Sequence, residues 1–328
     1  MLGVIQAIFV VIAACVLQAC AGQQSALDPA GENAERVAEL FWVMLGGAAV
    51  IWTLVLAAVV YATRVAPGRH CVRIGNALLL WGGLVLPTVT LAGLLTYGLA
   101  LMADLRVPGD GLKIAVAGEQ WWWRVHYHMP GADAPVASAN EVRLPRGQRV
   151  EIELTSPDVI HAFWLPSIAG KVDMIPGRVN RLVVEPTRTG TFRGACAEFC
   201  GESHALMAFS AVVMEPGAFE EWLAQQAAGA GAPATPLAAR GRELFDQVGC
   251  GACHAVRGTA AEGTIGPDLT HLAGRATLGA GILPNSHDAL VRWITRTETI
   301  KPGSRMPSFG ALPTHHVEAI ASYLESLE

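Results

Sequence analysis

Two long apolar segments in the first third of the chain restrict its fold more than any other feature. They cover residues 38–62 and 76–102, and they account for much of a composition that is 52% hydrophobic and only 16% charged. Each exceeds the roughly 20 residues that an α-helix needs to cross about 30 Å of hydrocarbon. We therefore predict a transmembrane helix hairpin over residues 38–103.

The loop between the two segments predicts their orientation. It contains Arg64, Arg69 and Arg73 and no acidic residue, whereas the segment before the first span is mainly acidic. Positively charged short loops stay in the cytoplasm. We therefore expect the cytoplasmic membrane of a bacterium, with everything from about residue 104 onward on its outer side.

The extreme N-terminus, residues 1–19, is a third apolar stretch, and its last three residues form the sequence LQAC together with Cys20. It resembles a lipoprotein signal peptide, so Cys20 is a candidate for lipidation, although the basic residues usual at the start of such signals are missing. An uncleaved third span is the alternative. Both predict an exported segment over residues 20–37. The net charge of −5 and the lack of a basic run argue against binding of nucleic acid.

The exported part divides by composition into two domains. Over residues 104–225, short segments rich in Val, Ile, Thr and aromatic residues alternate with Gly, Pro and Asn, which predicts an antiparallel β-sandwich or barrel. Residues 226–237 are rich in Ala, Gly and Pro and are typical of a flexible linker. The pattern becomes helical afterwards, so residues 238–328 are predicted to form a small, mostly α domain.

The helical domain carries the sequence CGACH, which is the attachment signature of a c-type haem. The thiols of Cys250 and Cys253 would form thioethers with the haem vinyl groups, and His254 would bind the iron. A redox-active cysteine pair is the alternative, but it would be expected next to a βαβ pattern, which this sequence lacks.

A haem iron of this kind needs a sixth ligand. Met306 is preferred, because it lies in a Pro- and Gly-containing loop directly before the last helical segment. Ligation by His and Met suits electron transfer, since it leaves no site open for a substrate. Resemblance to small soluble cytochromes c also implies that the Pro267 carbonyl accepts a hydrogen bond from His254. The alternative ligands are His271, His287, His315 and His316.

The sequence GACAEFCGESHALMAF contains a second candidate site. Cys200, His204 and Met207 have the spacing of a blue-copper loop, and His161 is available as a second imidazole. Cys196 adds a thiolate that blue copper lacks, and two thiolates can bridge two metal ions. The sequence therefore predicts a dinuclear copper site. A disulfide between the two cysteines is the alternative, but it does not explain the histidines and the methionine.

Four segments together resemble the CuA domain of cytochrome c oxidase subunit II, and two spans before an exported β domain match the layout of that subunit. They read CAEFCGESHALM, DVIHAFWLPS, KVDMIPGRVN and GEQWWWRVHY. With CGACH downstream, the whole chain resembles the variant in which a cytochrome c domain is fused to the C-terminus. The resemblance implies a cupredoxin-like β-sandwich.

The resemblance also implies a role for each candidate residue. Cys196 and Cys200 would supply two bridging thiolates, and His161 and His204 would supply two capping imidazoles. Met207 and the carbonyl oxygen of Glu198 would be the two weak axial ligands. The Glu198 carboxylate would also reach a magnesium ion shared with subunit I. Trp121 would receive electrons from a docked donor, and Asp158 and Asp173 match acidic positions beside the copper site.

The implied function is electron transfer in respiration. Electrons would reach the fused haem c, pass through CuA and go on to subunit I, where oxygen is reduced with proton pumping. The implied partners are subunits I and III and a periplasmic donor such as a cytochrome c or the upstream bc complex. One feature departs from the family: the second span begins with the apolar sequence NALLLWGGLVLP, where many members have a glutamate that feeds a proton channel.

A free-standing, membrane-anchored electron-transfer or copper-delivery protein is the alternative function. A copper chaperone would need neither Met207 nor a covalent haem, and a simple anchor needs only one span. Gly82, Gly83 and Pro87 in the second span favour close packing on a partner helix instead. A quinol oxidase subunit is disfavoured by the complete set of copper ligands.

Overall fold

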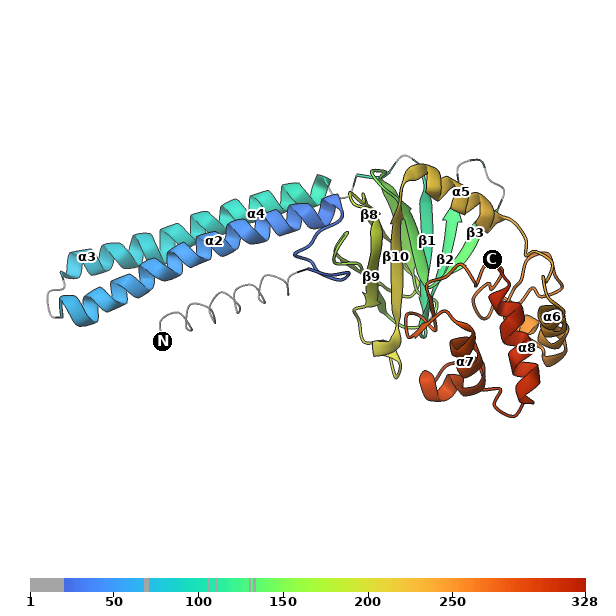
Figure 1. Ribbon diagram of the computed structural model, residues 1–328. Helices are drawn as coiled ribbons and strands as arrows, with labels where there is room; N and C mark the ends of the chain where they lie inside the picture. The colour runs from blue at the N-terminus through green and yellow to red at the C-terminus, as the bar shows by residue number, and fades with distance from the viewer. Residues whose placement is uncertain (1–20, 68–70, 105–106, 110, 130, 132–133) are drawn as a thin grey trace, which may run out of the picture. The chain divides into compact units, whose positions relative to one another are not determined.

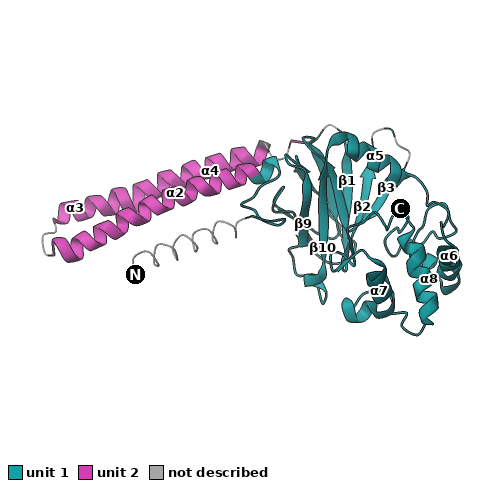
Figure 2. Cartoon of the chain, in the orientation of Figure 1, with its two compact units in different colours: residues 1–34, 108–328 teal, residues 35–107 magenta. Residues whose placement is uncertain are grey.

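The computed structural model describes residues 21–67, 71–104, 107–109, 111–129, 131 and 134–328 (Figure 1). The chain forms two compact units, which are coloured separately in Figure 2. One unit comprises residues 35–107, and the other comprises residues 1–34 and 108–328. The predicted signal over residues 1–19 and the candidate lipidation site Cys20 lie outside the described residues.

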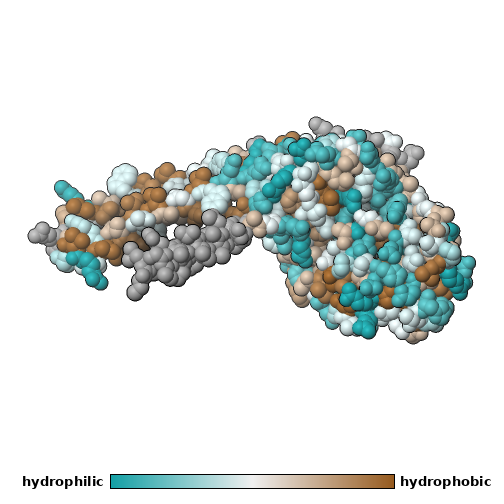
Figure 3. Space-filling view, viewed as in Figure 1, coloured by the Kyte–Doolittle hydropathy of each residue, from teal (hydrophilic) through white to brown (hydrophobic). Residues whose placement is uncertain are grey.

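The unit of residues 35–107 consists of two long apolar helices. The first is α2 (Glu32–Val60), which continues as the π-helical segment Tyr61–Val65, and the second runs through α3 (Val72–Ala77), the π-helical segment Leu78–Val85 and α4 (Leu86–Asp104). Both are long and apolar enough to cross a membrane. Their apolar side chains cover the surface of the hairpin (Figure 3), as expected for helices that face hydrocarbon. The two predicted apolar helices are confirmed.

The β domain, defined here as residues 112–215, is a sandwich of two five-stranded sheets (Figure 1). The sheets have the strand orders β3-β2-β1-β5-β8 and β4-β10-β9-β6-β7. The strands are β1 (Lys113–Glu119), β2 (Trp122–His128), β3 (Val136–Ala139), β4 (Glu141–Pro145), β5 (Val150–Thr155), β6 (His161–Trp164), β7 (Lys171–Met174), β8 (Asn180–Val184), β9 (Gly190–Cys196) and β10 (Ala208–Met214).

The core of the sandwich follows from the alternation of side chains along each strand. In β2 every second residue, from Trp123 to Tyr127, is buried. The Trp123 ring meets Phe163 and Phe209 of the other sheet edge-on, with centroids 5.7 and 5.1 Å away. Such edge-to-face pairs add stability beyond the buried area. The predicted sandwich is confirmed.

Two strand pairs in the sandwich are parallel, although the sequence predicted an antiparallel fold. These are β1 with β5 and β4 with β10. The chain leaves the first sheet after β3 and enters the second at β4, so β4 meets β10 from a distant part of the chain. Asn140 makes this crossing with a φ of 59°, and its side-chain oxygen accepts a hydrogen bond from the Trp123 backbone N–H (2.9 Å).

The C-terminal domain, defined here as residues 236–328, is mainly helical, as predicted. After α5 (Pro216–Ala227) it contains α6 (Pro236–Val248), α7 (His287–Ile300), α8 (Thr314–Glu325) and the short strand pair β11 (Thr277–Leu278) and β12 (Leu283–Pro284). Proline at the first turn starts both α5 and α6, where its missing N–H costs no hydrogen bond. The Thr235 hydroxyl caps α6 by accepting from the Ala238 N–H (3.1 Å).

The first residues of the predicted linker are attached to the C-terminal domain. The Arg257 guanidinium donates to the carbonyls of Gln226 and Ala228, and the Ala230 N–H donates to the Arg257 carbonyl (2.8 Å). His271 Nε2 also contacts the Ala228 carbonyl at 3.1 Å. Flexibility of the linker therefore stays a prediction, which these contacts and the Thr235 cap confine to residues 231–234.

The β domain and the C-terminal domain belong to one compact unit and share a docking interface. Among the described residues, six hydrogen bonds cross this interface. They join Arg124 to the Thr264 carbonyl, Arg143 to the Gly274 carbonyl, Ala276 N–H to Glu141, Ser203 to the Pro302 carbonyl, Ala208 N–H to the Ala280 carbonyl, and Lys301 to the Leu206 carbonyl.

Helices α6 and α8 cross at Gly241, and this close contact predicts the effect of a substitution. A Cβ atom at Gly241 would overlap the Ala319 carbonyl, so we expect Gly241→Ala to cost about 1–3 kcal/mol of unfolding free energy through overpacking. Gly217→Ala in α5 is the matched control. No atom lies within 4 Å of its added Cβ, and alanine favours helix by about 1 kcal/mol. Denaturant unfolding followed by circular dichroism measures both; equal midpoints would contradict the crossing.

Candidate metal and haem sites

The predicted copper ligands come from two neighbouring strands and the loop between them. Cys196 ends β9, and the loop to β10 carries Cys200, the 3₁₀ turn His204–Leu206 and Met207. His161 is the first residue of β6, which pairs with β9 so that Phe163 lies opposite Cys196. This register brings the distant His161 beside the cysteine loop.

The six predicted ligand groups lie together, with four of them around the sulfur atoms of Cys196 and Cys200. Cys196 Sγ and Cys200 Sγ are 3.8 Å apart and both cysteines are free thiols, so no disulfide joins them. Around Cys196 Sγ lie His161 Nδ1 at 3.9 Å and the Glu198 carbonyl at 3.2 Å. Around Cys200 Sγ lie His204 Nδ1 at 3.5 Å and Met207 Sδ at 3.9 Å.

Hydrogen bonds behind the ligands fix their orientation. His161 Nε2 donates to Asp158 Oδ1 (2.9 Å), which leaves the lone pair of Nδ1 directed at the sulfurs. The Cys200 carbonyl accepts from Gln120 Nε2 (2.8 Å) and from the Trp121 indole N–H (3.0 Å). The sequence singled out Trp121 but missed Gln120, whose only signal is its position directly before the three tryptophans.

The electrostatics of the sulfur pair favour one thiolate. The hydrogen bond from the Cys200 thiol lowers the pKa of Cys196, and the same bond raises the pKa of Cys200. Burial lowers the pKa of His161, but its bonds to Cys196 and Asp158 outweigh burial and the pKa is raised overall. The ligands are therefore charge-coupled before any metal binds.

The donor set fits a copper pair. Two cysteine sulfurs, two imidazole nitrogens and a thioether are soft or intermediate ligands, which suit copper and not magnesium or calcium. His161, Cys196 and Cys200 have ligand atoms within 4.8 Å of one another, and all three residues are buried. The arrangement can hold a redox-active metal away from water.

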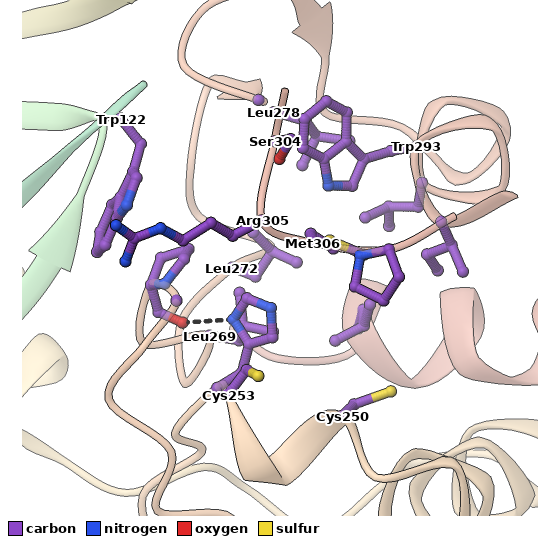
Figure 4. A pocket seen from close by; sticks show the side chains of 18 of the residues that line it. Trp122, Cys250, Cys253, Leu269, Leu272, Leu278, Trp293, Ser304, Arg305 and Met306 are labelled. Atoms are coloured by element: carbon purple, nitrogen blue, oxygen red, sulfur yellow. Dashed lines mark hydrogen bonds between the residues drawn. The ribbon is translucent and has the colours of Figure 1, made fainter. Parts of the chain in front are cut away.

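The predicted haem residues line a large cavity in the C-terminal domain (Figure 4). Cys250 and Cys253 lie on one side of it and Met306 on the other. His254 Nδ1 donates to the Pro267 carbonyl (2.8 Å), which leaves Nε2 with a lone pair for iron. Burial lowers the pKa of His254, so the imidazole stays neutral and can act as a ligand. These residues fit a c-type haem.

Among the candidates for a sixth ligand, Met306 alone lines the described cavity. His271 uses both ring nitrogens on the carbonyls of Glu328 and Ala228. His287 lies between the carboxylates of Glu318 and Glu325. The geometry therefore favours the thioether, and the ligand assignment itself stays a prediction.

Tryptophans of the β domain close one side of the haem cavity. Trp121 and Trp122 both line it, and Figure 4 shows Arg305 directed toward Trp122. The Arg124 guanidinium lies over the Trp122 ring, 4.6 Å from its centroid. Trp123 is pure core, as the alternation of side chains requires. No pattern in the sequence predicts that the Arg305 side chain points toward Trp122.

Comparisons with known proteins agree with this geometry. Residues 112–215 match the family described as cytochrome c oxidase subunit II, periplasmic domain, and residues 238–328 match the cytochrome c family. A cytochrome c oxidase subunit 2 from Alkalihalophilus pseudofirmus is 32% identical over 327 residues, which are 95% of this chain and 94% of that protein. The chain belongs to the cytochrome c oxidase subunit II family.

Other members of the subunit II family are similar over shorter stretches. The cytochrome c oxidase subunit 2 of Bacillus sp. PS3 is 31% identical over 259 residues, which are 75% of this chain and 70% of that protein. Among solved structures, the periplasmic domain of subunit II of Bradyrhizobium japonicum cytochrome oxidase is 31% identical, covers 37% of this chain and 96% of its own, and has a TM-score of 0.34.

The family defines the function. As a member of this family, the chain is a subunit II of a cytochrome c oxidase, and it carries a fused cytochrome c domain. Its two domains imply a copper centre and a haem. The expected fold and function are therefore confirmed, and the rival of a free-standing protein is not needed.

The copper ligands predict the effect of Cys200→Ser. Serine offers a hard oxygen in place of a sulfur that lies near three other ligand atoms, so the dinuclear copper spectrum should disappear while haem is retained. Electron paramagnetic resonance and metal analysis of the purified oxidase measure this. Cys71→Ser, at an exposed cysteine, is the control. A surviving mixed-valence signal in Cys200→Ser would refute the bridging role.

The haem cavity predicts the effect of Met306→Ala. Loss of the thioether should let exogenous cyanide or carbon monoxide bind the iron and should lower the reduction potential of the haem. Optical titration of the purified oxidase measures both changes. His316→Ala, outside the described lining of the cavity, should change neither. An unchanged spectrum in Met306→Ala would transfer the axial role to one of the histidines.

Proposed function

We propose that this chain accepts electrons at a covalently attached haem c and delivers them to subunit I through CuA, with Trp121 between the two sites. The observation that supports the proposal is the double contact of Trp121. Its ring lines the haem cavity, and its indole N–H donates to the carbonyl of Cys200. One residue thus touches the surroundings of both predicted centres.

The chain would hold its cofactors through the residues described above. Cys250, Cys253 and His254 would attach the haem, and Met306 would be its sixth ligand. The copper pair would be bound by His161, Cys196, Cys200, His204, Met207 and the Glu198 carbonyl. When bound, these groups supply successive one-electron carriers without an open coordination position.

The residues of the chain do the rest by position. Asp158 holds the His161 ring so that its Nδ1 is available to the metal. Gln120 and Trp121 fix the Cys200 carbonyl, and burial keeps the thiols away from water. Fixed ligands reduce the rearrangement that accompanies each change of charge, which favours rapid electron transfer.

The finer assignments extend the proposal to the complex. We infer that both exported domains lie on the periplasmic side of the bacterial cytoplasmic membrane, that Cys20 is lipidated, and that the Glu198 carboxylate helps bind magnesium at the contact with subunit I. Subunits I and III and a periplasmic cytochrome c or bc complex are the proposed partners. A second apolar helix, where a simple anchor needs one, supports a complex.

The Trp121 contact predicts the effect of two substitutions on electron transfer. Trp121→Leu removes both the ring and the bond to Cys200, so copper reduction after haem c reduction should slow roughly tenfold, or by about 1.4 kcal/mol of barrier. Trp122→Leu, which lines the same cavity without that bond, should have a smaller effect. Stopped-flow spectroscopy of the oxidase from native membranes measures both rates.

Two observations, one from the stopped-flow rates and one from solubilisation of the native membrane, would contradict the proposal. Equal rates in Trp121→Leu and the unaltered enzyme would remove Trp121 from the route. A chain that leaves the native membrane without a large haem-bearing subunit would favour the free-standing electron-transfer or copper-delivery protein.

A further inference from the structure

One of the six hydrogen bonds across the docking interface comes from a buried lysine. Lys301 directly follows α7 and is only 3% exposed. Its Nζ donates to the carbonyl of Leu206 in the β domain (2.9 Å) and to that of Gly279 in the C-terminal domain (2.7 Å). Within the described part of the chain, no carboxylate forms an ion pair with it.

This burial is costly, so it calls for a structural reason. Lysines are almost never fully buried, because the amine loses its hydration. Burial lowers the pKa of Lys301 to about 7, against an opposing effect of the nearby Cys200 sulfur. The side chains of the other two lysines, Lys113 and Lys171, are 52% and 45% exposed. In the part of the chain that the structure describes, two carbonyls thus hold the amine of Lys301.

The β-domain carbonyl that Lys301 binds belongs to the loop of residues 197–207 between β9 and β10, which is called the copper loop here because it carries predicted copper ligands. Leu206 lies between the predicted ligands His204 and Met207. On either side of it, the Ser203 hydroxyl donates to the Pro302 carbonyl (2.7 Å) and the Ala208 N–H donates to the Ala280 carbonyl (3.0 Å). Three residues, two in this loop and the first of β10, are therefore attached to the C-terminal domain, and Leu206, which Lys301 binds, is the central one.

The loop that carries Lys301 also covers Trp121. Gly303 has a φ of +74°, and a Cβ atom there would lie 2.7 Å from Cη2 of the Trp121 ring. Glycine at this position therefore lets the backbone lie directly against the indole. Trp121 is only 8% exposed in this arrangement.

We propose that Lys301 fastens the C-terminal domain to the copper loop and so keeps Trp121 covered, which prevents a separate donor protein from contacting this tryptophan. A donor then reaches the chain through the C-terminal domain. The part that concerns donors rests on the proposed function, whereas the fastening by Lys301 does not.

Lys301→Met in the purified oxidase complex tests the proposal. Methionine keeps an apolar stem but removes the donors, which leaves two buried carbonyls without a partner. We expect the docking equilibrium constant to fall about tenfold, equivalent to about 1.4 kcal/mol. Hydrogen exchange at the Ala208 amide, which donates across the interface, should accelerate by the same factor. Hydroxyl-radical labelling of Trp121 should also increase.

Matched controls separate docking from general damage. Lys113→Met removes an exposed lysine 3.8 Å from Glu151, which keeps Arg181 as a partner, so exchange and labelling should stay unchanged. Ser203→Ala removes one neighbouring interface bond from the β-domain side and should act in the same direction as Lys301→Met, but more weakly. Circular dichroism and the haem spectrum verify that each variant is folded.

The outcomes distinguish the two proposals. Unchanged exchange at Ala208 and unchanged labelling of Trp121 in folded Lys301→Met would overturn the fastening role. Loss of copper with Ala208 still protected would overturn it too, since Lys301 would then act on the loop alone. If the unaltered chain bound neither copper nor haem while Lys301→Met still exposed Ala208, the proposed function would fail and the fastening role would stand.

Discussion

The pairing of β6 with β9 is the contact on which the copper site depends. It brings His161 beside Cys196 across 35 positions of sequence, and without it the cysteine loop would have only one imidazole. The pairing is stabilised by the aromatic core, where Trp123, Phe163 and Phe209 meet between the two sheets. A hydrophobic interior thus sets the position of a polar centre at its edge.

Local spacing predicted the ligands, and long-range packing did not follow from it. Cys200, His204 and Met207 share a short loop, and CGACH places three haem residues in five positions, so sequence alone could identify them. The direction of β4 beside β10 could not be foreseen, because it depends on the crossing at Asn140. The docking of the β domain on the C-terminal domain could not be predicted either, because its contacts join residues that are far apart in the sequence.

The contacts that join the domains are made mostly to backbone carbonyls, which every sequence contains. Among the described residues, the Lys301 amine binds two such carbonyls and no carboxylate. The Arg257 guanidinium binds the carbonyls of Gln226 and Ala228 in addition to its ion pair with Asp268. No pattern of complementary side chains reveals these carbonyl contacts. For the same reason, the composition of the Ala- and Gly-rich residues 226–237 predicts a flexible linker and does not reveal these contacts. Its first residues are held because Arg257 binds the backbone carbonyls of Gln226 and Ala228, and His271 contacts the carbonyl of Ala228.

The Cys200 carbonyl accepts both the Gln120 amide and the Trp121 indole, and this has a consequence for how the subunit matures. With both lone pairs engaged, the peptide plane after Cys200 has little freedom to rotate, whether or not an ion is present. The direction of the Cys200 carbonyl is therefore set by contacts within the chain itself. Insertion of copper would then require little rotation of the peptide that follows Cys200.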